Sequence, residues 1–333
     1  MLKKLPFSFY GNKAIRVIID TDCHNQVDDQ YCVAHALMTP QFDIRGIVAE
    51  HYGTLMEDRS QERSYEEVVK ILNLMDLADE VKAYRGAEGA LLDEKTPYDT
   101  EGARFIVEEA LKEDDRPLYV CCIGAITNMA SAYLLNPAIE DKLTVVWIGG
   151  GVYPQGGHEF NQDADIHAVN VIMKSKINLW QVPINVYHMM YVPMTGLINH
   201  IYPYGKIGKY LVEYTFEFAT HTKEWMEKWY ATMTPEERSK RAPQSSADMQ
   251  VAGGYGSMWR LGDSPVVGIL MFGDVGNYET HSAPFQINTD GTYDMSKPGS
   301  RDIRVYTDID ANFIINDMYE KFKCYFSEWK NEF

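Results

Sequence analysis

The sequence predicts one α/β domain with a mainly parallel central sheet and helices on both faces, in an open Rossmann-like arrangement. Short, almost continuous apolar runs such as "AIRVIID" (14–20) alternate with segments of helical period. Strands that are apolar on both sides are typical of parallel sheets covered by helices. The 333 residues suit one large domain or two small ones, and no linker or internal repeat divides them. We therefore expect residues 1–333 to form a single domain.

The apolar runs and helical periods also predict the order of the elements. Strands are expected at 14–20, 42–50, 117–124 and 143–150, with one or two more in 177–186 and a last one beginning near 302. Helices are expected at 28–38, 57–75, 104–113 and 127–135, and a closing amphipathic helix follows the last strand. Residues 196–245 are rich in Tyr, Trp, Lys and Glu and are predicted to be a helical, lid-like insertion.

The overall composition excludes several classes of partner. The formal net charge is −17, which argues against nucleic acid or an anionic membrane surface and fits a neutral small molecule or a bound cation. The five cysteines have no regular spacing, so we expect no disulfide framework. Neither a signal peptide nor an apolar stretch of membrane-spanning length is evident, and we expect a cytoplasmic location.

The stretch "IDTDCHNQVDDQ" (19–30) places four aspartates directly after the first strand, namely Asp20, Asp22, Asp28 and Asp29. Ligands bind at the carboxyl ends of the strands in such sheets, which locates this cluster at the ligand edge. Calcium prefers about six to eight oxygen ligands, and Asp22 and Asp29 bracket a loop that can enclose it. As an alternative, Asp28 and Asp29 only cap the following helix, but capping does not explain the first two aspartates.

Several motifs in order along the chain resemble one known family. They are "DTD…VDDQYCVAHAL", "IGAITNMASAYLLNP" (123–137), "HEFNQDADIHAVNVI" (158–172), "GDSPVVGIL" (262–270) and "RDIRVYTDIDANFI" (301–314). Together they are similar to the inosine–uridine-preferring nucleoside hydrolases, over most of the chain. The resemblance implies a nucleoside hydrolase-like fold and a homodimer or homotetramer. It also implies hydrolysis of the N-glycosidic bond of a ribonucleoside or related N-riboside.

The resemblance further implies a Ca²⁺ site and a base. The calcium ligands would be Asp22, Asp29, Asp263 and the backbone carbonyl of Ile123. Asp22 would also take a proton from the attacking water.

The sugar would be bound by carboxylates and amides. Asp28, Glu159 and Asn161 would hold ribose hydroxyls, and Asp20 would support Asp22. As an alternative, Glu159, Phe160 and Asn161 form only a polar turn after the glycine-rich segment "GGGVYPQGGHEF".

The chain departs from the family pattern at several positions. The opening loop is two residues longer, so His24 or Asn25 could enter the site. As an alternative, His24 is simply a solvated residue of the loop. Gly262 stands where many members have a histidine that assists departure of the base. Trp259 could contact a base or simply pack in the core, and His51, after the second strand, is either a site residue or a packed one.

Two other functions stay open from the sequence. The first is a non-catalytic calcium- or sugar-binding member of the same fold. The second is a haloacid-dehalogenase-like phosphatase, which also begins with Asp-x-Asp after its first strand. That family has Thr or Val two residues after the second aspartate, where this chain has His24.

Overall fold

Eight strands form the central sheet of the computed structural model, which describes residues 8–53, 58–231, 234 and 257–327. Among residues 221–231 only the backbone is described. The strands are β1 (Ile15–Thr21), β2 (Phe42–Ala49), β3 (Ala83–Arg85), β4 (Leu118–Cys122), β5 (Thr144–Ile148), β6 (Asn178–Val182), β9 (Gly276–Ser282) and β12 (Asp302–Ile309). Their order is β3-β2-β1-β4-β5-β6-β12-β9, and every pair is parallel except β12 with β9. The predicted fold class is confirmed.

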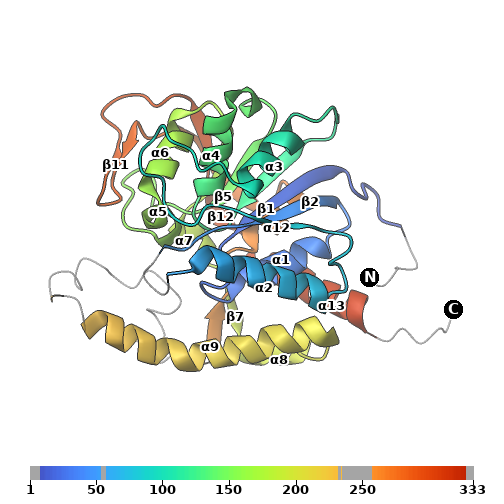
Figure 1. Cartoon of the computed structure of the whole chain (residues 1–333). Helices are drawn as coiled ribbons and strands as arrows, with labels where there is room; N and C mark the ends of the chain where they lie inside the picture. The colour runs from blue at the N-terminus through green and yellow to red at the C-terminus, as the bar shows by residue number, and fades with distance from the viewer. Residues whose placement is uncertain (1–7, 54–57, 232–233, 235–256, 328–333) are drawn as a thin grey trace.

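Helices cover both faces of this sheet (Figure 1). On one face lie α3 (Glu101–Ala110), α4 (Thr127–Leu135), α5 (Phe160–Ala164) and α6 (Ile166–Lys174), with a 3₁₀ turn at Pro137–Ile139. On the other lie α1 (Asp28–Leu37), α2 (Ser60–Leu74), α8 (Met194–His200), α9 (Gly205–Ala231), α12 (Pro265–Met271) and α13 (Ala311–Phe326). The short helix α7 (Ile184–Tyr187) follows β6.

The alternation of side chains along β1 explains the two layers. Val17 and Ile19 join the buried cluster beneath α1 and α2, whereas Ile18 joins the cluster beneath α3 and α4. A strand buried on both faces reads as a continuous apolar run, as this one does.

Two small antiparallel pairs complete the structure, β7 (Tyr191–Pro193) with β8 (Met258–Arg260) and β10 (Gln286–Ile287) with β11 (Tyr293–Asp294). These pairs, β3 and β9 were not expected from the sequence. The edge strand β9 reads "GNYETHS" and is largely exposed, so it carries no apolar pattern. The segment 177–186 gives one strand and then α7.

The predicted insertion at 196–245 contains most of α8 and all of α9, and its residues 232–233 and 235–245 lie outside the described residues. Helix α9 packs against α2, where the Tyr210 hydroxyl donates to Glu67 and the Lys70 ammonium lies 3.9 Å from the Tyr210 ring centroid. A role as a lid stays a prediction.

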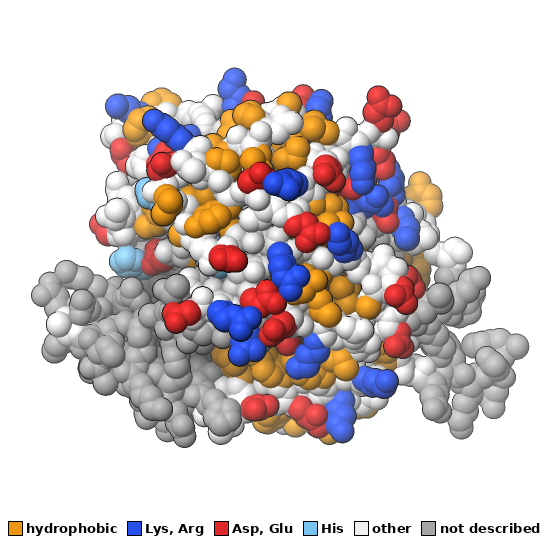
Figure 2. Space-filling model, in the orientation of Figure 1, with side chains coloured by type: hydrophobic (Ala, Val, Ile, Leu, Met, Phe, Trp, Pro, Cys, Tyr) orange, Lys and Arg blue, Asp and Glu red, His pale blue; other side chains and the backbone are white. Residues whose placement is uncertain are grey.

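The excess negative charge is not gathered on the face in Figure 2, where acidic and basic side chains are interspersed. No helix within the described ranges is both long and apolar enough to cross a bilayer.

Candidate functional site

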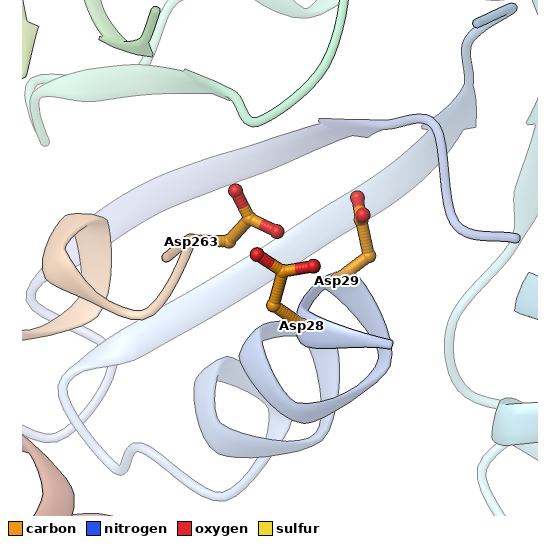
Figure 3. Close-up of side chains that lie close together, drawn as sticks. All are labelled: Asp28, Asp29 and Asp263. Carbon is orange, nitrogen blue, oxygen red and sulfur yellow. The ribbon is translucent and has the colours of Figure 1, made fainter. Parts of the chain in front are cut away.

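Three aspartates from two distant parts of the chain meet at the carboxyl end of β1. Asp28 and Asp29 begin α1, and Asp263 lies just before α12. One carboxylate oxygen from each lies within 4.8 Å of the others, and Figure 3 shows the three side chains around one space. The thiol of Cys32 in α1 donates to the Asp263 carbonyl at 3.3 Å, which ties the late segment to α1. The predicted convergence of Asp29 and Asp263 is therefore present, and Asp28 joins them.

The loop between β1 and α1 is folded around Asp22. The Asp22 carbonyl accepts from the backbone N–H of His24 at 2.7 Å and of Asn25 at 3.0 Å. The Asn25 side-chain amide donates to Asp22 Oδ2 at 3.3 Å. The loop thus turns back on Asp22, and Asn25 contacts this carboxylate directly.

Close packing brings Asp22 to the residue that follows the predicted Ile123 ligand. A Cβ atom on Gly124 would lie 2.8 Å from Asp22 Cγ, so only glycine allows this approach. On the other side, the Thr21 hydroxyl donates to Asp29 Oδ1 at 2.5 Å. Gly124 therefore leaves space for the Asp22 side chain, and the Thr21 hydroxyl fixes the position of the Asp29 carboxylate.

The carboxyl groups of Asp22, Asp28, Asp29 and Asp263 all have pKa values above the ordinary range. Burial is the main cause: Asp22 and Asp29 are each 2% exposed and Asp263 is 4% exposed. The negative charges of Asp28 and Asp29 raise the pKa values of Asp22 and Asp263 further. Burial raises the pKa of Asp29 to about 7 and that of Asp28 to about 6.

Some groups oppose this effect, since the Gly262 N–H donates to Asp28 Oδ2 at 3.1 Å and the positive charge of Arg260 lowers the pKa of Asp28. These two groups lower the pKa of Asp28 less than burial raises it.

Buried like charges need a compensating partner, and an all-oxygen donor set suits a hard cation such as Ca²⁺ or Mg²⁺. The site therefore fits a divalent metal ion.

Glu159 and Asn161 lie beside this cluster, at the start of α5. Glu159 caps that helix, and its carboxylate accepts from the N–H groups of Gly150, Asn161 and Gln162. It also accepts from the Tyr187 hydroxyl at 2.7 Å.

Asn161 faces two strand ends. Its amide nitrogen donates to the Ile148 carbonyl at 2.9 Å and lies 3.5 Å from the Ile123 carbonyl. The side chain thus reaches the same carbonyl that the sequence predicts as a metal ligand.

Asp20 and His51 belong to a polar layer behind the cluster. Asp20 Oδ1 accepts from the Asn128 amide at 2.8 Å, and burial raises the Asp20 pKa to about 7. His51 is fully buried, accepts from the Gly53 N–H at Nδ1, and has Nε2 at 2.8 Å from the Thr127 hydroxyl.

The remaining candidates lie among aromatic rings. His24 Nδ1 is 3.3 Å from the Tyr52 hydroxyl, and its ring centroid is 6.2 Å from that of Tyr214. Trp259 is 1% exposed and packs edge-on against Phe218, as a core residue does.

Sequence reasoning missed Tyr187, Gly124 and Thr21. A usable signal existed for Tyr187, because it follows β6 and so lies at the ligand edge of the sheet. Gly124 directly follows Ile123, but its contact with Asp22 depends on packing between neighbouring strands.

Comparison with known proteins shows the family. The model of the inosine-uridine preferring nucleoside hydrolases matches residues 17–313. The chain therefore belongs to this family and, by class, to the N-glycosyl hydrolases. This membership gives no support to a haloacid-dehalogenase-like phosphatase.

The sequence relatives are distant. An uncharacterised protein of Schizosaccharomyces pombe is 23% identical over 216 residues, which cover 57% of this chain and 69% of that protein. The pyrimidine-specific ribonucleoside hydrolase RihA of Escherichia coli is 23% identical over 192 residues, 50% of this chain and 60% of RihA. The match thus spans less than two thirds of RihA.

Solved structures share the fold along nearly the whole chain. A purine-preferring ribonucleoside hydrolase from Gardnerella vaginalis has a TM-score of 0.70 at 16% identity, covering 92% of this chain and 98% of that one. A plant nucleoside hydrolase has a TM-score of 0.68 at 17% identity, covering 93% and 99%.

Proposed function

We propose that this protein hydrolyses the N-glycosidic bond of a ribonucleoside or related N-riboside, using a bound Ca²⁺ ion and Asp22 as the base. The observation that carries the proposal is the group of buried carboxyl groups with raised pKa values at the ligand edge. In a chain of this family, such a group calls for a cation and for a substrate without negative charge.

Asp22, Asp29, Asp263 and the Ile123 carbonyl would hold the ion. When bound, Ca²⁺ supplies positive charge that offsets these carboxylates and increases the acidity of a nearby water molecule. The proximity of Asp22 to Asp29 and of Asp29 to Asp263 supports this set. Ile123 ends the run "LYVCCI", so its carbonyl can point out of the sheet edge.

The chain's own side chains would take up the proton and stabilise the transition state. Asp22 accepts the proton of the attacking water, and Asn25 orients Asp22 through the 3.3 Å contact. The transition state of glycosyl transfer has oxocarbenium character, and the surrounding carboxylates stabilise its positive charge.

The sugar would lie between the acidic cluster and the start of α5. Asp28 has one oxygen held by Gly262, and this fixes its direction toward a ribose hydroxyl. Asn161 offers its amide oxygen to a second hydroxyl, while Glu159 borders the same space from the α5 cap.

The other candidates have different surroundings. His24, between Tyr52 and Tyr214, is proposed to border the base. The burial of His51 and Trp259 favours structural roles, and Asp20 acts through Asn128.

The test is release of reducing sugar from a panel of nucleosides and nicotinamide riboside, with Ca²⁺ present. We expect release by the wild type and a loss of about 1000-fold or more in Asp22→Ala, because a base and a metal ligand are removed together. Asp99→Ala is the matched control, since Asp99 is exposed and pairs with Arg104 on the surface. Unchanged turnover in a folded Asp22→Ala variant would refute the assigned base.

The second candidate function is calcium or sugar binding without turnover. Gly262 favours it, because this chain lacks the histidine that assists departure of the base in many members of the family. Melting curves with Ca²⁺, ribose and nucleosides separate the two. Stabilisation by nucleosides without any sugar release by the wild type would support the binding function instead.

A further inference from the structure

Tyr187 contacts both sides of the proposed sugar site. Its hydroxyl donates to Glu159 Oε1 at 2.7 Å. Its ring lies against Gly262, where a Cβ atom would come 3.1 Å from Tyr187 Cδ2. The tyrosine reaches the site from α7, an element separate from the opening loop, from α5 and from the segment before α12.

Gly262 in turn holds Asp28. Its backbone N–H donates to Asp28 Oδ2 at 3.1 Å, and an added Cβ would lie 3.2 Å from the same oxygen. The φ angle of Gly262 is not in the left-handed region, so the backbone itself accepts other residues. Space therefore decides what position 262 tolerates, and Tyr187 fills part of that space.

We propose that Tyr187 is a positioning and specificity-determining residue, which orients Glu159 through its hydroxyl and holds the Gly262–Asp28 contact through its ring. The proposal rests on the proposed function for its meaning in the reaction. Tyr187 acts on the sugar side through two carboxylates at once.

The Tyr187 hydroxyl fixes the orientation of the Glu159 carboxylate. The three backbone donors to Glu159 belong to the cap of α5 and to Gly150, whereas Tyr187 is the one side chain that donates to it among the described residues. A phenol oxygen that donates its proton also keeps an acceptor site, which suits a sugar hydroxyl. Glu159 and Tyr187 together therefore form one fixed recognition edge.

The ring contributes the shape of the site next to Asp28. The ring lies where a side chain at 262 would begin, so even an added Cβ atom is in tight contact with Tyr187 and Asp28 and one of them must shift. A larger residue at 262 must displace either the Tyr187 ring or the Asp28 carboxylate. The pair Tyr187 and Gly262 thus limits what fits beside the sugar.

The first test is Tyr187→Phe, which keeps the ring and removes only the hydroxyl. We expect KM for the best nucleoside to rise about 5-fold to 10-fold while kcat changes less than about 2-fold, because contacts equal in ground and transition states affect KM alone. Partial unfolding would instead lower the apparent kcat and leave KM unchanged. An unchanged KM would overturn the role of the hydroxyl.

The second test is a double-mutant cycle between Gly262→Ala and Tyr187→Val. In the wild-type background Gly262→Ala should reduce kcat/KM about 10-fold, and in the Tyr187→Val background only about 2-fold, because the smaller side chain leaves room for the new methyl group. Equal losses in both backgrounds would overturn the role of the ring.

The same cycle, measured by urea unfolding, separates this proposal from the proposed function. If the wild type releases no sugar, the proposed function fails. The steric contact still predicts that Gly262→Ala destabilises the wild type more than the Tyr187→Val variant. Additive changes in stability would then overturn the contact itself.

Discussion

The two ends of helix α1 contain buried ionisable groups in opposite situations. At its N-terminal end, Asp28 and Asp29 face Asp263 and Asp22. Burial raises the pKa values of all four carboxyl groups, and like charge raises those of Asp22, Asp29 and Asp263 further. At its C-terminal end, fully buried His35 has Nε2 2.6 Å from an Asp317 oxygen.

The C-terminal cluster is compensated within the chain. The Lys321 ammonium donates to Asp317 at 2.5 Å and to the Thr39 hydroxyl at 2.9 Å. Burial acts to raise the pKa of Asp317, but His35 and the charge of Lys321 outweigh it and lower that pKa. Burial lowers the pKa of His35 to about 4, so the imidazole is neutral near pH 7.

The difference indicates which buried acids are structural. Asp317 has a cation supplied by α13. Among the residues that the structure describes, the acidic cluster of Asp22, Asp28, Asp29 and Asp263 has only the partial offset that Arg260 gives Asp28. A buried charge without an internal partner needs an external one. One end of α1 therefore serves stability, and we propose that the other serves cation binding.

The largest expected effect comes from Asp29→Asn. Removal of one negative charge should abolish stabilisation by Ca²⁺ and lower sugar release about 1000-fold or more. The metal-free variant should be at least as stable as the wild type, because one of several repelling charges is gone. Melting curves with EDTA and with Ca²⁺ measure the stability of the variant, and an assay of sugar release measures its activity, with Asp99→Asn as the control for both. Retained sugar release would contradict the prediction.

Lys321→Met tests the compensated end. We expect the free energy of unfolding to fall by about 2 kcal/mol, because Asp317 and His35 lose their buried cation while Asp317 keeps some access to water. Stabilisation by Ca²⁺ should be unchanged in the folded variant. Urea denaturation measures the loss, and Lys142→Met, a surface lysine paired with Asp141, is the control with a smaller effect.

Gly124→Ala perturbs the acidic end without changing any charge. The added methyl group would press on Asp22, and we expect kcat/KM and Ca²⁺ affinity to fall about 10-fold. Gly89→Ala is the matched control, because apart from its chain neighbours no heavy atom of the described residues lies within 4 Å of a Cβ built there. Equal behaviour of the two variants would mean that the position of Asp22 is unimportant.

The two ends should also respond oppositely to pH. Asp29, with its pKa raised from 3.8 to about 7, keeps its proton longer in the folded state, so metal-free stability falls as pH rises through this window. His35, with its pKa lowered from 6.5 to about 4, contributes stability that rises with pH from about 4 to 6.5. Bound Ca²⁺ should change the contribution of Asp29 to the pH dependence of stability and leave that of His35 unchanged.

Urea denaturation at about pH 5 and about pH 7, with EDTA and with Ca²⁺, separates the two contributions. The stabilisation by Ca²⁺ should be larger at the higher pH, where binding displaces fewer protons. A stabilisation that is independent of pH would contradict the raised pKa values.

The sequence predicted the strands and helices that are long and apolar. Strand 14–20 and helix 127–135 correspond closely to β1 and to α4. The edge strand β9 was missed because its pairing with β12 comes from backbone hydrogen bonds, which leave no apolar pattern in an exposed strand.

The candidate site was predictable where it follows from strand ends and motif order, as for Asp29 and Asp263. The environment of each side chain was not. The Glu159 carboxylate accepts four hydrogen bonds from within the chain, and Tyr187 reaches it from a helix that no pattern indicated. Such contacts depend on packing between distant segments, which periodicity does not describe.

We propose that the uncompensated end of α1 binds a cation that hydrolysis requires. The most direct measurement is a Ca²⁺ titration of EDTA-treated wild-type protein, with metal occupancy and sugar release from a ribonucleoside followed in the same samples. We predict that release is absent without the ion and rises in proportion to occupancy. Sugar release that persists in EDTA, or full occupancy without any release, would contradict the account.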